Sequence, residues 1–469
     1  PGLVLAGLEA EALGGGEDTI HAIARIPRNG PLPLSFAQER LWFLHQLEPE
    51  TAAYNIPTST LIEGKLDFIA LERALNAVVK RHESLRTSFS TVNGQPVQGI
   101  APALHVSLPV VELSNVSASQ SDAAVQRLIN QRSHEPFDLA EAPLLRVFLI
   151  QLGPERNQLV TIHHLICDAW SVGILFQELS IFYEIFTGGE LPMPPELAIQ
   201  YVDFAAWQRG FIEGRRLIEQ LTYWRQQLHG SPLALEIPSD RARPIQPSYR
   251  GARHCFKMTE GLTAAIKASS RSHSTTPFMT LLAAFKILLF RYTDCDDVIV
   301  GSPIAGRSHA YVEDLIGPFA NNLALRSNLS GNPTFRETLW RERESCLGAY
   351  AHQDLPFEKL VEELQPERHL SRNPLFQVML IFHNTPIFVP SFTGTQCRRL
   401  DVDNGTAKLD LTLSISEREE KYVGYVEYST DLFDRDRIER MAGHFQTLLE
   451  AIVADPDQSI ATLPMLTEA

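Results

Sequence analysis

A chain of 469 residues exceeds the roughly 250–300 residues at which one hydrophobic core stops growing, so two lobes are expected. Its net charge of −15, from 41 basic and 56 acidic side chains, disfavours a nucleic-acid binder, because such proteins usually carry a basic surface. No signal peptide and no apolar run of about 18 residues are visible, and the five cysteines form no Cys-x-x-Cys pair, so we expect a cytoplasmic protein with reduced thiols and no membrane span.

The first half of the chain is predicted to alternate helices and strands. Residues 1–30 carry few core residues and include Gly14-Gly15-Gly16, which indicates a linker within a longer polypeptide. Apolar residues at helical spacing predict helices that begin at Ser35 and that cover 68–80, 122–132, 171–187 and 203–228. Apolar runs predict strands over 144–151 and 158–162, and Asn93-Gly94 predicts a hairpin turn.

The second half repeats this alternation after a proline-rich connection over 232–247. Helices are predicted over 280–292, 335–350 and 434–453, and strands over 297–302, 375–383, 409–416 and 422–428. Two halves that each mix helices with strands predict two related α/β lobes.

The most informative segment is His163-His164-Leu165-Ile166-Cys167-Asp168. It lies where the strand over 158–162 ends and the helix over 171–187 begins, which is a place where a fold can hold an ionisable group open to a ligand. A histidine there can move a proton near neutral pH, since its unperturbed pKa is about 6.5. Consecutive strand residues point to opposite faces, so we expect one histidine to be packed and the other presented. Taken alone, a histidine pair at a strand end is more often structural than catalytic.

Other chemistries lack their sequence signals. No third ligand stands at a fixed spacing from the two histidines, so no metal site is expected. The chain has no Gly-x-Ser-x-Gly elbow, no Gly-x-x-x-x-Gly-Lys loop and no Gly-x-Gly-x-x-Gly turn, which disfavours that class of serine hydrolase and nucleotide-dependent chemistry. Cys167 lies on an apolar segment and is interpreted as a core residue rather than a nucleophile.

Seven segments together resemble the condensation domains of nonribosomal peptide synthetases. The His-His-x-x-x-Asp signature stands at 163–168. The other six, in chain order, are Ser35–Trp42, Arg81–Phe89, Tyr201–Trp207, Ile316–Asn322, His352–Glu358 and Ser371–Leu375. They keep the family's order and cover the chain from about residue 32. The form of the His352–Glu358 segment is most similar to the subtype that joins an L-configured donor to an L-configured acceptor.

The resemblance implies an α/β fold of two chloramphenicol-acetyltransferase-like lobes, arranged as a V-shaped pseudo-dimer around a central tunnel. We expect the N-terminal lobe over 31–210 and the C-terminal lobe over 211–469, with 1–30 as the linker from a preceding carrier domain. The implied partners are upstream and downstream peptidyl carrier proteins and an adjacent adenylation domain, with no nucleic acid and no membrane. No cofactor is expected to be bound by the domain itself, because phosphopantetheine arms of the carriers deliver the substrates.

The resemblance also implies roles for the residues of the signature. The second histidine is the family's catalytic one, so His164 carries that role here. His163 and Asp168 are expected to support the site, Asp168 through an ion pair with Arg307 of the second lobe. The family usually has glycine after the aspartate, and this chain has Ala169, whose N–H or a protonated His164 would donate to the oxyanion of the tetrahedral intermediate.

Four further residues are expected to line the substrate tunnel, namely Trp170, Ser171, Asn321 and Asn322. Asn322 stands where the family often has threonine. Alanine in place of the usual glycine adds a methyl group, so the tunnel is expected to be narrower at that point. We interpret both departures as fine tuning or drift, with a specialised subtype as the alternative.

The expected activity is amide-bond formation between a carrier-bound donor thioester and the amine of a carrier-bound acceptor. Whether His164 acts as a general base or as a positioning group is left open. One alternative is a modifying domain that dehydrates a tethered serine or threonine, or epimerises before condensing, for which Ala169 is the only hint. The other is a non-catalytic recruitment platform, which would be expected to have a degraded signature.

Overall fold

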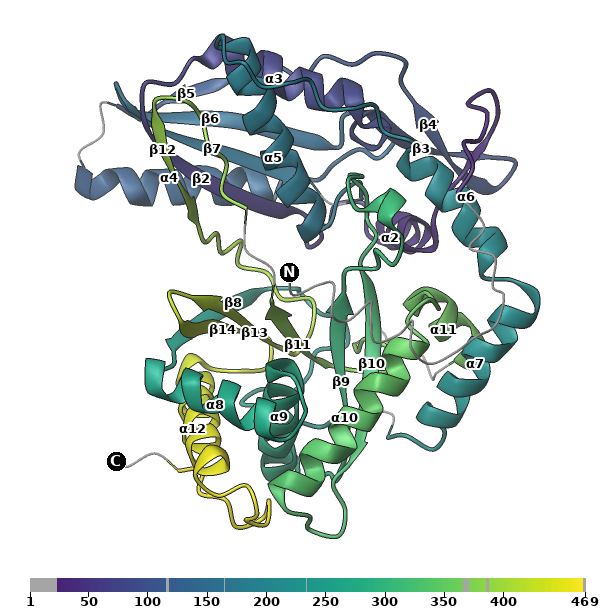
Figure 1. Ribbon diagram of the computed structural model, residues 1–469, viewed down its shortest axis with the longest axis vertical. Coiled ribbons are helices and arrows are strands. Elements are labelled where there is room, and N and C mark those ends of the chain that lie inside the picture. Colours follow the sequence, from purple (N-terminus) through teal and green to yellow (C-terminus); the bar gives the residue numbers. More distant parts are fainter. Residues whose placement is uncertain are drawn as a thin grey trace.

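The computed structural model describes residues 23–114, 118–163, 165–232, 234–365, 371–384 and 388–466, without the side chains of 118–121 and 163. The chain forms two α/β lobes that lie one above the other in Figure 1. This arrangement confirms the predicted division into two α/β units. The exact boundaries near residues 30 and 210 stay predictions.

The first lobe is built on a five-stranded sheet in the order β12-β2-β7-β6-β5. Its strands are β2 (Ile56–Gly64), β5 (Val110–Glu112), β6 (Leu145–Gly153), β7 (Arg156–His163) and β12 (Thr395–Leu400). Helices α3 (Phe68–Arg81) and α5 (Ala169–Phe186) cover one face, and α4 (Ala118–Ser133) covers the other. Leu149 and Leu159 pack toward α3 and α5, whereas their neighbours Ile150 and Val160 pack toward α4. The apolar runs of these strands therefore serve two cores at once.

A small three-stranded sheet extends this lobe, in the order β1-β4-β3. Its strands are β1 (Leu32–Pro33), β3 (Thr87–Val92) and β4 (Gln95–Ile100). Asn93 and Gly94 connect β3 to β4 with φ angles of 51° and 78°, so the predicted hairpin turn is confirmed. Helix α2 (Phe36–Leu47) begins directly after Ser35, where the sequence predicted a helix to start. The structure adds that the Ser35 side chain caps this helix.

The second lobe contains a six-stranded sheet in the order β10-β9-β11-β13-β14-β8. Its strands are β8 (Gly251–Lys257), β9 (Asp297–Ile304), β10 (Asn321–Asn328), β11 (Val378–His383), β13 (Leu411–Arg418) and β14 (Lys421–Ser429). Helices α8 (Glu260–Ser272), α9 (Pro277–Thr293), α10 (Phe335–Ala351) and α12 (Arg435–Ala454) pack with this sheet in one core. A fully buried ion pair, Lys286–Glu342 at 2.9 Å, joins α9 to α10 within it.

Two features of the connections differ from expectation. The single helix predicted over 203–228 is wrong: α6 (Tyr201–Phe211) and α7 (Gly214–Leu228) are separate helices. Gly214 has a φ of +57°, a left-handed conformation that ends regular helix hydrogen bonding at the break. The second feature is β12, which follows second-lobe strands in the sequence but pairs with β2 of the first lobe over Thr395–Leu400. The chain therefore crosses between the lobes and returns to form β13.

No helix in the described part of the chain is by itself long and apolar enough to cross a membrane. Among the helices that the structure describes, α8 and α9 taken together reach that length and composition, but the chain bends by 105° between them.

Helix α11 (Phe357–Leu364) approaches α2 from the second lobe. Arg40 of α2 forms an ion pair of 3.2 Å with Glu358 of α11, and its guanidinium lies 5.6 Å from the ring centre of Phe357. These contacts connect the two lobes.

Candidate active site

The signature segment lies at the end of β7, as its pattern predicted. The last residue of β7, His163, pairs with Ile56 of β2 and with Leu145 of β6. His164 and the side chain of His163 lie outside the described residues, so their predicted roles stay predictions. The segment continues through the buried residues 165–167 to Asp168, which begins α5 as its N-cap. The strand end and the helix start therefore flank the position predicted to be catalytic.

The Asp168 carboxylate connects the two lobes. Its Oδ1 accepts a hydrogen bond of 2.8 Å from the N–H of Ser171, which caps α5. Its Oδ2 accepts from the N–H groups of Phe319 and Ala320, at 3.0 and 3.2 Å. These two residues directly precede β10 of the second lobe, so one carboxylate satisfies backbone donors of both lobes.

Arg307 is the cationic partner of Asp168. Its Nη2 lies 3.4 Å from Asp168 Oδ1 and donates to Ser171 Oγ at 2.7 Å, while Nη1 donates to the Leu315 carbonyl at 2.8 Å. Its guanidinium carbon also lies 4.1 Å from the ring centre of Phe319. The side chain is only 2% exposed. Burial lowers the pKa of Arg307, and the Asp168 charge opposes that shift. The contact expected between the two residues is therefore present, and its importance for catalysis stays a prediction.

Two of the four residues predicted to line the tunnel, Ser171 and Asn321, use polar side chains to bind backbone groups of the second lobe. Ser171 is fully buried, and its Oγ accepts from the Gly317 N–H at 3.1 Å while lying 2.8 Å from the Gly317 carbonyl oxygen. Asn321 uses its amide group to donate to the carbonyls of Gln353 and Leu355, at 3.0 and 2.8 Å. Both side chains therefore hold backbone segments in place, and contact with a substrate stays a prediction for each.

The other predicted residues are more accessible. Ala169 is exposed at the first turn of α5, and Trp170 is half-buried, with its indole N–H donating to the Glu313 carbonyl at 3.2 Å. Asn322 is half-buried at the second position of β10. A methyl group at position 169 thus lies on a surface next to the signature rather than in the core.

Sequence reasoning did not assign a role to Tyr201, although it lies in one of the family-like segments. Its hydroxyl oxygen lies 2.7 Å from Ser35 Oγ and 2.9 Å from the Pro318 carbonyl, so it joins α6 to the loop that carries the Asp168 contacts. Burial raises the pKa of Tyr201 well above its ordinary value, so the phenol stays protonated at neutral pH. The sequence signal for this role was the place of Tyr201 at the start of the family-like segment Tyr201–Trp207.

The Tyr201 ring packs directly against Gly317. A Cβ added at Gly317 would lie 1.9 Å from a ring carbon of Tyr201, closer than any real contact. We expect Gly317→Ala to lower the free energy of unfolding by about 1–3 kcal/mol, because the ring or the loop must move. Urea unfolding followed by tryptophan fluorescence measures this loss.

Gly210→Ala is the matched control for that substitution. Gly210 lies inside α6, and an added Cβ would meet no atom within 4 Å. This control is expected to be neutral or slightly stabilising, because alanine is the better helix former. Equal losses in the two variants would contradict the close packing at Gly317.

Neither a reactive thiol nor a metal site is found beside the signature in the described residues. Burial raises the pKa of the Cys167 thiol well above its ordinary value, which opposes formation of a thiolate. No group of three or more His, Cys, Asp or Glu side chains within the described ranges is arranged to hold a metal ion.

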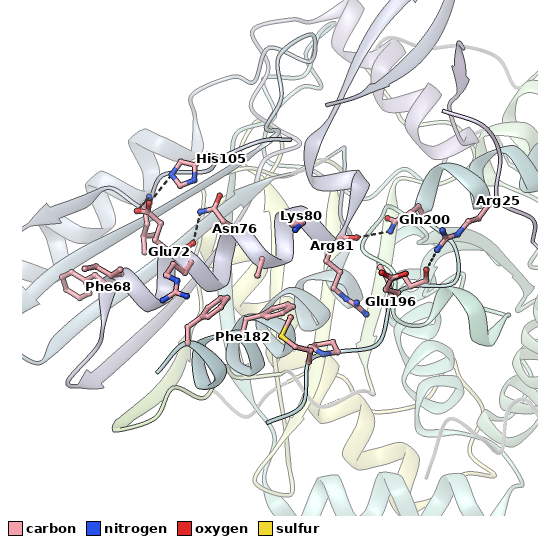
Figure 2. A pocket seen from close by; sticks show the side chains of 18 residues that line it. Arg25, Phe68, Glu72, Asn76, Lys80, Arg81, His105, Phe182, Glu196 and Gln200 are labelled. Atoms are coloured by element: carbon pink, nitrogen blue, oxygen red, sulfur yellow. Dashed lines mark hydrogen bonds and ion pairs between the residues drawn. The ribbon is translucent and has the colours of Figure 1, made fainter. Parts of the chain in front are cut away.

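A groove of about 900 Å³ lies elsewhere on the first lobe, between α3, α5 and the loop before α6 (Figure 2). Phe182 and Phe186 of α5 form part of its apolar wall, and Arg73 and Lys80 of α3 contribute positive charge. Phe182 follows Asp168 by roughly 20 Å along the helix axis. The groove is therefore separate from the site at the start of α5.

Comparison with known proteins gives consistent matches. A family model described as "Condensation domain" matches residues 29–469. A linear gramicidin synthase protein of Brevibacillus parabrevis is 46% identical over 462 residues, which are 97% of this chain and 9% of that protein. Malpinin synthetase of Mortierella alpina is 42% identical over 459 residues, which are 98% of this chain and 6% of that protein. The chain thus spans less than a tenth of the length of these relatives.

Solved structures share the fold over nearly the whole chain. The complex of the X-domain and OxyB from teicoplanin biosynthesis contains a chain that matches with a TM-score of 0.86 and 28% identity. The match covers 96% of this chain and 99% of that one. This likeness bears out the two-lobed fold that the motifs implied.

Proposed function

Since this chain belongs to the condensation-domain family, we propose that it forms an amide bond between two building blocks held as thioesters on carrier proteins. The observation that supports this most strongly is the intact signature at 163–168, flanked by a strand end and a helix start and tied to the second lobe through Asp168. A catalytic group placed there would meet substrates that enter between the lobes.

The proposed reaction needs no nucleophile from the protein. The amine nitrogen of the acceptor attacks the thioester carbonyl of the donor, and a tetrahedral oxyanion forms. The carbon–sulfur bond then breaks, the donor carrier leaves as a thiol, and the acceptor keeps the new amide. Holding both reactants in one geometry can supply up to about 7–11 kcal/mol of the barrier.

His164 is proposed to remove the proton from the attacking amine or to position that amine by a hydrogen bond. The Ala169 N–H or a protonated His164 would donate to the oxyanion. Asp168 and Arg307 are proposed to support this geometry, because they fix the start of α5 relative to the second lobe. His163 is assigned to the same supporting group, and Trp170, Ser171, Asn321 and Asn322 to the lining of the tunnel.

The partners belong to the proposal as well. Phosphopantetheine arms of upstream and downstream carrier proteins would deliver the two thioesters, and an adenylation domain would supply the activated building block. The L-donor and L-acceptor subtype and a cytoplasmic location stay predictions.

A transfer assay tests the proposal. Donor and acceptor carrier proteins are each loaded with one amino acid, mixed with the domain and weighed by intact-protein mass spectrometry. We expect the donor mass to appear on the acceptor carrier. Loss of one water from a serine- or threonine-loaded carrier would instead indicate a dehydrating domain.

The second candidate function is a non-catalytic domain that recruits a partner protein. It is considered because a solved chain of similar fold, with a TM-score of 0.86, comes from the complex of the X-domain and OxyB. Carrier binding without any transfer of mass by the wild-type domain would favour this candidate. The presence of both His164 and Asp168 supports the catalytic proposal over it.

A further inference from the structure

The groove between α3, α5 and the loop before α6 exposes apolar side chains that no described part of the chain covers (Figure 2). Ile69 is 76% exposed and Met193 is 63% exposed, and both line the groove. Phe182 and Phe186 form its wall on the side of α5. Contiguous apolar surface on a folded domain marks a place where another segment or protein binds. The groove is therefore a candidate docking site, and its occupant has to match its chemistry.

Positive charge predominates among the ionisable residues of the groove. Its lining includes four arginine or lysine side chains and two glutamates. One of these carboxylates, that of Glu72, lies 3.2 Å from His105 Nε2. Arg73 and Lys80 are exposed, and neither has a carboxylate partner in the described part of the chain. Their spacing on α3 places them on the same side of that helix, about 10 Å apart along its axis. An occupant of the groove is therefore expected to carry carboxylates beside apolar side chains.

The chain enters the described structure at one end of this groove. Ile23, the first described residue, is buried in a cluster with Leu197, which also lines the groove. Arg25 lines the same end, opposite Phe68 (Figure 2). The Arg25 guanidinium donates to the carbonyls of Leu197 and Ala198, at 2.5 and 2.7 Å. The segment that precedes Ile23 therefore joins the described structure beside the groove.

The sequence of residues 1–22 has the chemistry that this groove lacks. The segment contains four acidic residues and no lysine or arginine. Glu9 and Glu11 are the charged residues between positions 3 and 13. The large apolar residues of the same stretch are Leu3, Val4, Leu5, Leu8 and Leu13. Residues 3–13 therefore combine carboxylates with apolar side chains, which complements a groove that combines cations with apolar side chains.

The connecting residues are long enough for residues 3–13 to lie along the groove. Residues 14–22 can span at most about 30 Å when extended, whereas helix α3 is about 20 Å long. In an extended chain Glu9 and Glu11 point to the same side, about 7 Å apart. The two long cationic side chains of α3 can bridge the remaining difference in spacing.

We propose that the groove is a docking site for residues 3–13 of this same chain. In the docked arrangement the Glu9 and Glu11 carboxylates face the two cations of α3, and the leucines cover the apolar wall. This inference does not depend on the transfer reaction. Residues 1–30 are predicted to connect the domain to a preceding carrier, so the contact would hold that carrier against the first lobe and limit its range of motion.

Photocrosslinking in the full chain tests the contact. The photoreactive residue p-benzoylphenylalanine replaces Leu8, the protein is irradiated, and crosslinked peptides are identified by mass spectrometry. We expect crosslinks to groove residues of α3 and α5, such as Ala77 and Phe186. An equal mixture of unlabelled and isotope-labelled protein identifies the occupant, because a crosslink within one copy carries a single label. Crosslinks that combine both labels would assign the groove to a second copy, and crosslinks only to other surfaces would also overturn the inference.

Charge reversal in the groove tests the electrostatic part of the contact. Arg73→Glu/Lys80→Glu is expected to lower the crosslink yield about fivefold, the upper range for one exposed ion pair. Arg127→Glu/Lys421→Glu is the matched control, since it changes the net charge equally at two exposed positions that do not line the groove. This control is expected to keep the original yield. Equal yields in the groove variant and the control would contradict the proposed pairing.

A reciprocal substitution in the segment completes the experiment. Glu9→Lys/Glu11→Lys is expected to lower the crosslink yield by a similar factor, because lysines then face the cations of α3. Combining it with the charge reversal in the groove is expected to restore most of the yield, since opposite charges face each other again. A combined variant that recovers no yield would show that these charges do not meet, and the docking arrangement would be wrong.

Discussion

Asp168→Ala is expected to lower the free energy of unfolding by about 3–5 kcal/mol, the usual cost of leaving a buried charge without its partner. The substitution leaves the Arg307 guanidinium 2% exposed beside an apolar ring, with no carboxylate against it. It also removes the cap of α5 and the acceptor for the N–H groups of Phe319 and Ala320. Urea unfolding followed by circular dichroism measures the loss.

The double variant Asp168→Ala/Arg307→Met separates the ion pair from the other contacts. Because it removes both charges, we expect it to lose less stability than the sum of the two single variants. Glu219→Ala is a matched control, since it breaks the exposed pair of Arg215 and Glu219 and is expected to cost at most about 0.5 kcal/mol. If Asp168→Ala cost no more than this control, the carboxylate would not be the connection between the lobes that its contacts indicate.

His164→Ala is expected to have the largest effect on the reaction. If the imidazole removes the proton from the attacking amine, the transfer rate should fall about 10²–10⁴-fold, the range for a general base. An α-amine with a pKa of about 7.7–8.0 is already partly neutral at pH 7, so a fall of about tenfold would assign His164 to positioning. Single-turnover transfer, followed by mass spectrometry at pH 7 and pH 8, measures the rate.

His105→Ala is the matched control for that experiment. His105 is an exposed histidine that lines the groove of the first lobe (Figure 2), and none of residues 163–171 lines that groove. It is expected to transfer at the wild-type rate. A wild-type rate in His164→Ala would remove this residue from the mechanism, and the catalytic assignment carried by the family resemblance would fail with it.

Local signals in the sequence predicted the elements that short-range physics determines. Asn93-Gly94 favours left-handed φ angles, and the turn has them. The apolar spacing over 171–187 predicted a helix just after Asp168, and the Asp168 Oδ1 binds the Ser171 N–H at the start of α5. In each case the responsible atoms lie within a few residues of one another, so the pattern contains the whole cause.

Long-range contacts could not be predicted in the same way. Nothing in Thr395–Leu400 indicates that this strand pairs with β2 rather than with a strand of its own half, because any extended segment offers the same backbone donors and acceptors. The break between α6 and α7 was also missed, since apolar spacing continues across it and Gly214 alone marks it. The family resemblance predicted Arg307 as the partner of Asp168. The N–H groups of Phe319 and Ala320, which also donate to the Asp168 carboxylate, were found only in the structure.

The amino-acid sequence by itself determined the alternation of helices and strands, the place of the histidine signature between a strand and a helix, and the family. Only the tertiary structure decided that Asp168 binds backbone of the other lobe and that Tyr201 fills the space over Gly317. The physical reason is distance along the chain. Helices, turns and caps follow from neighbours a few residues apart, whereas burial, charge pairing and pKa shifts depend on groups that meet only after the two lobes have packed together.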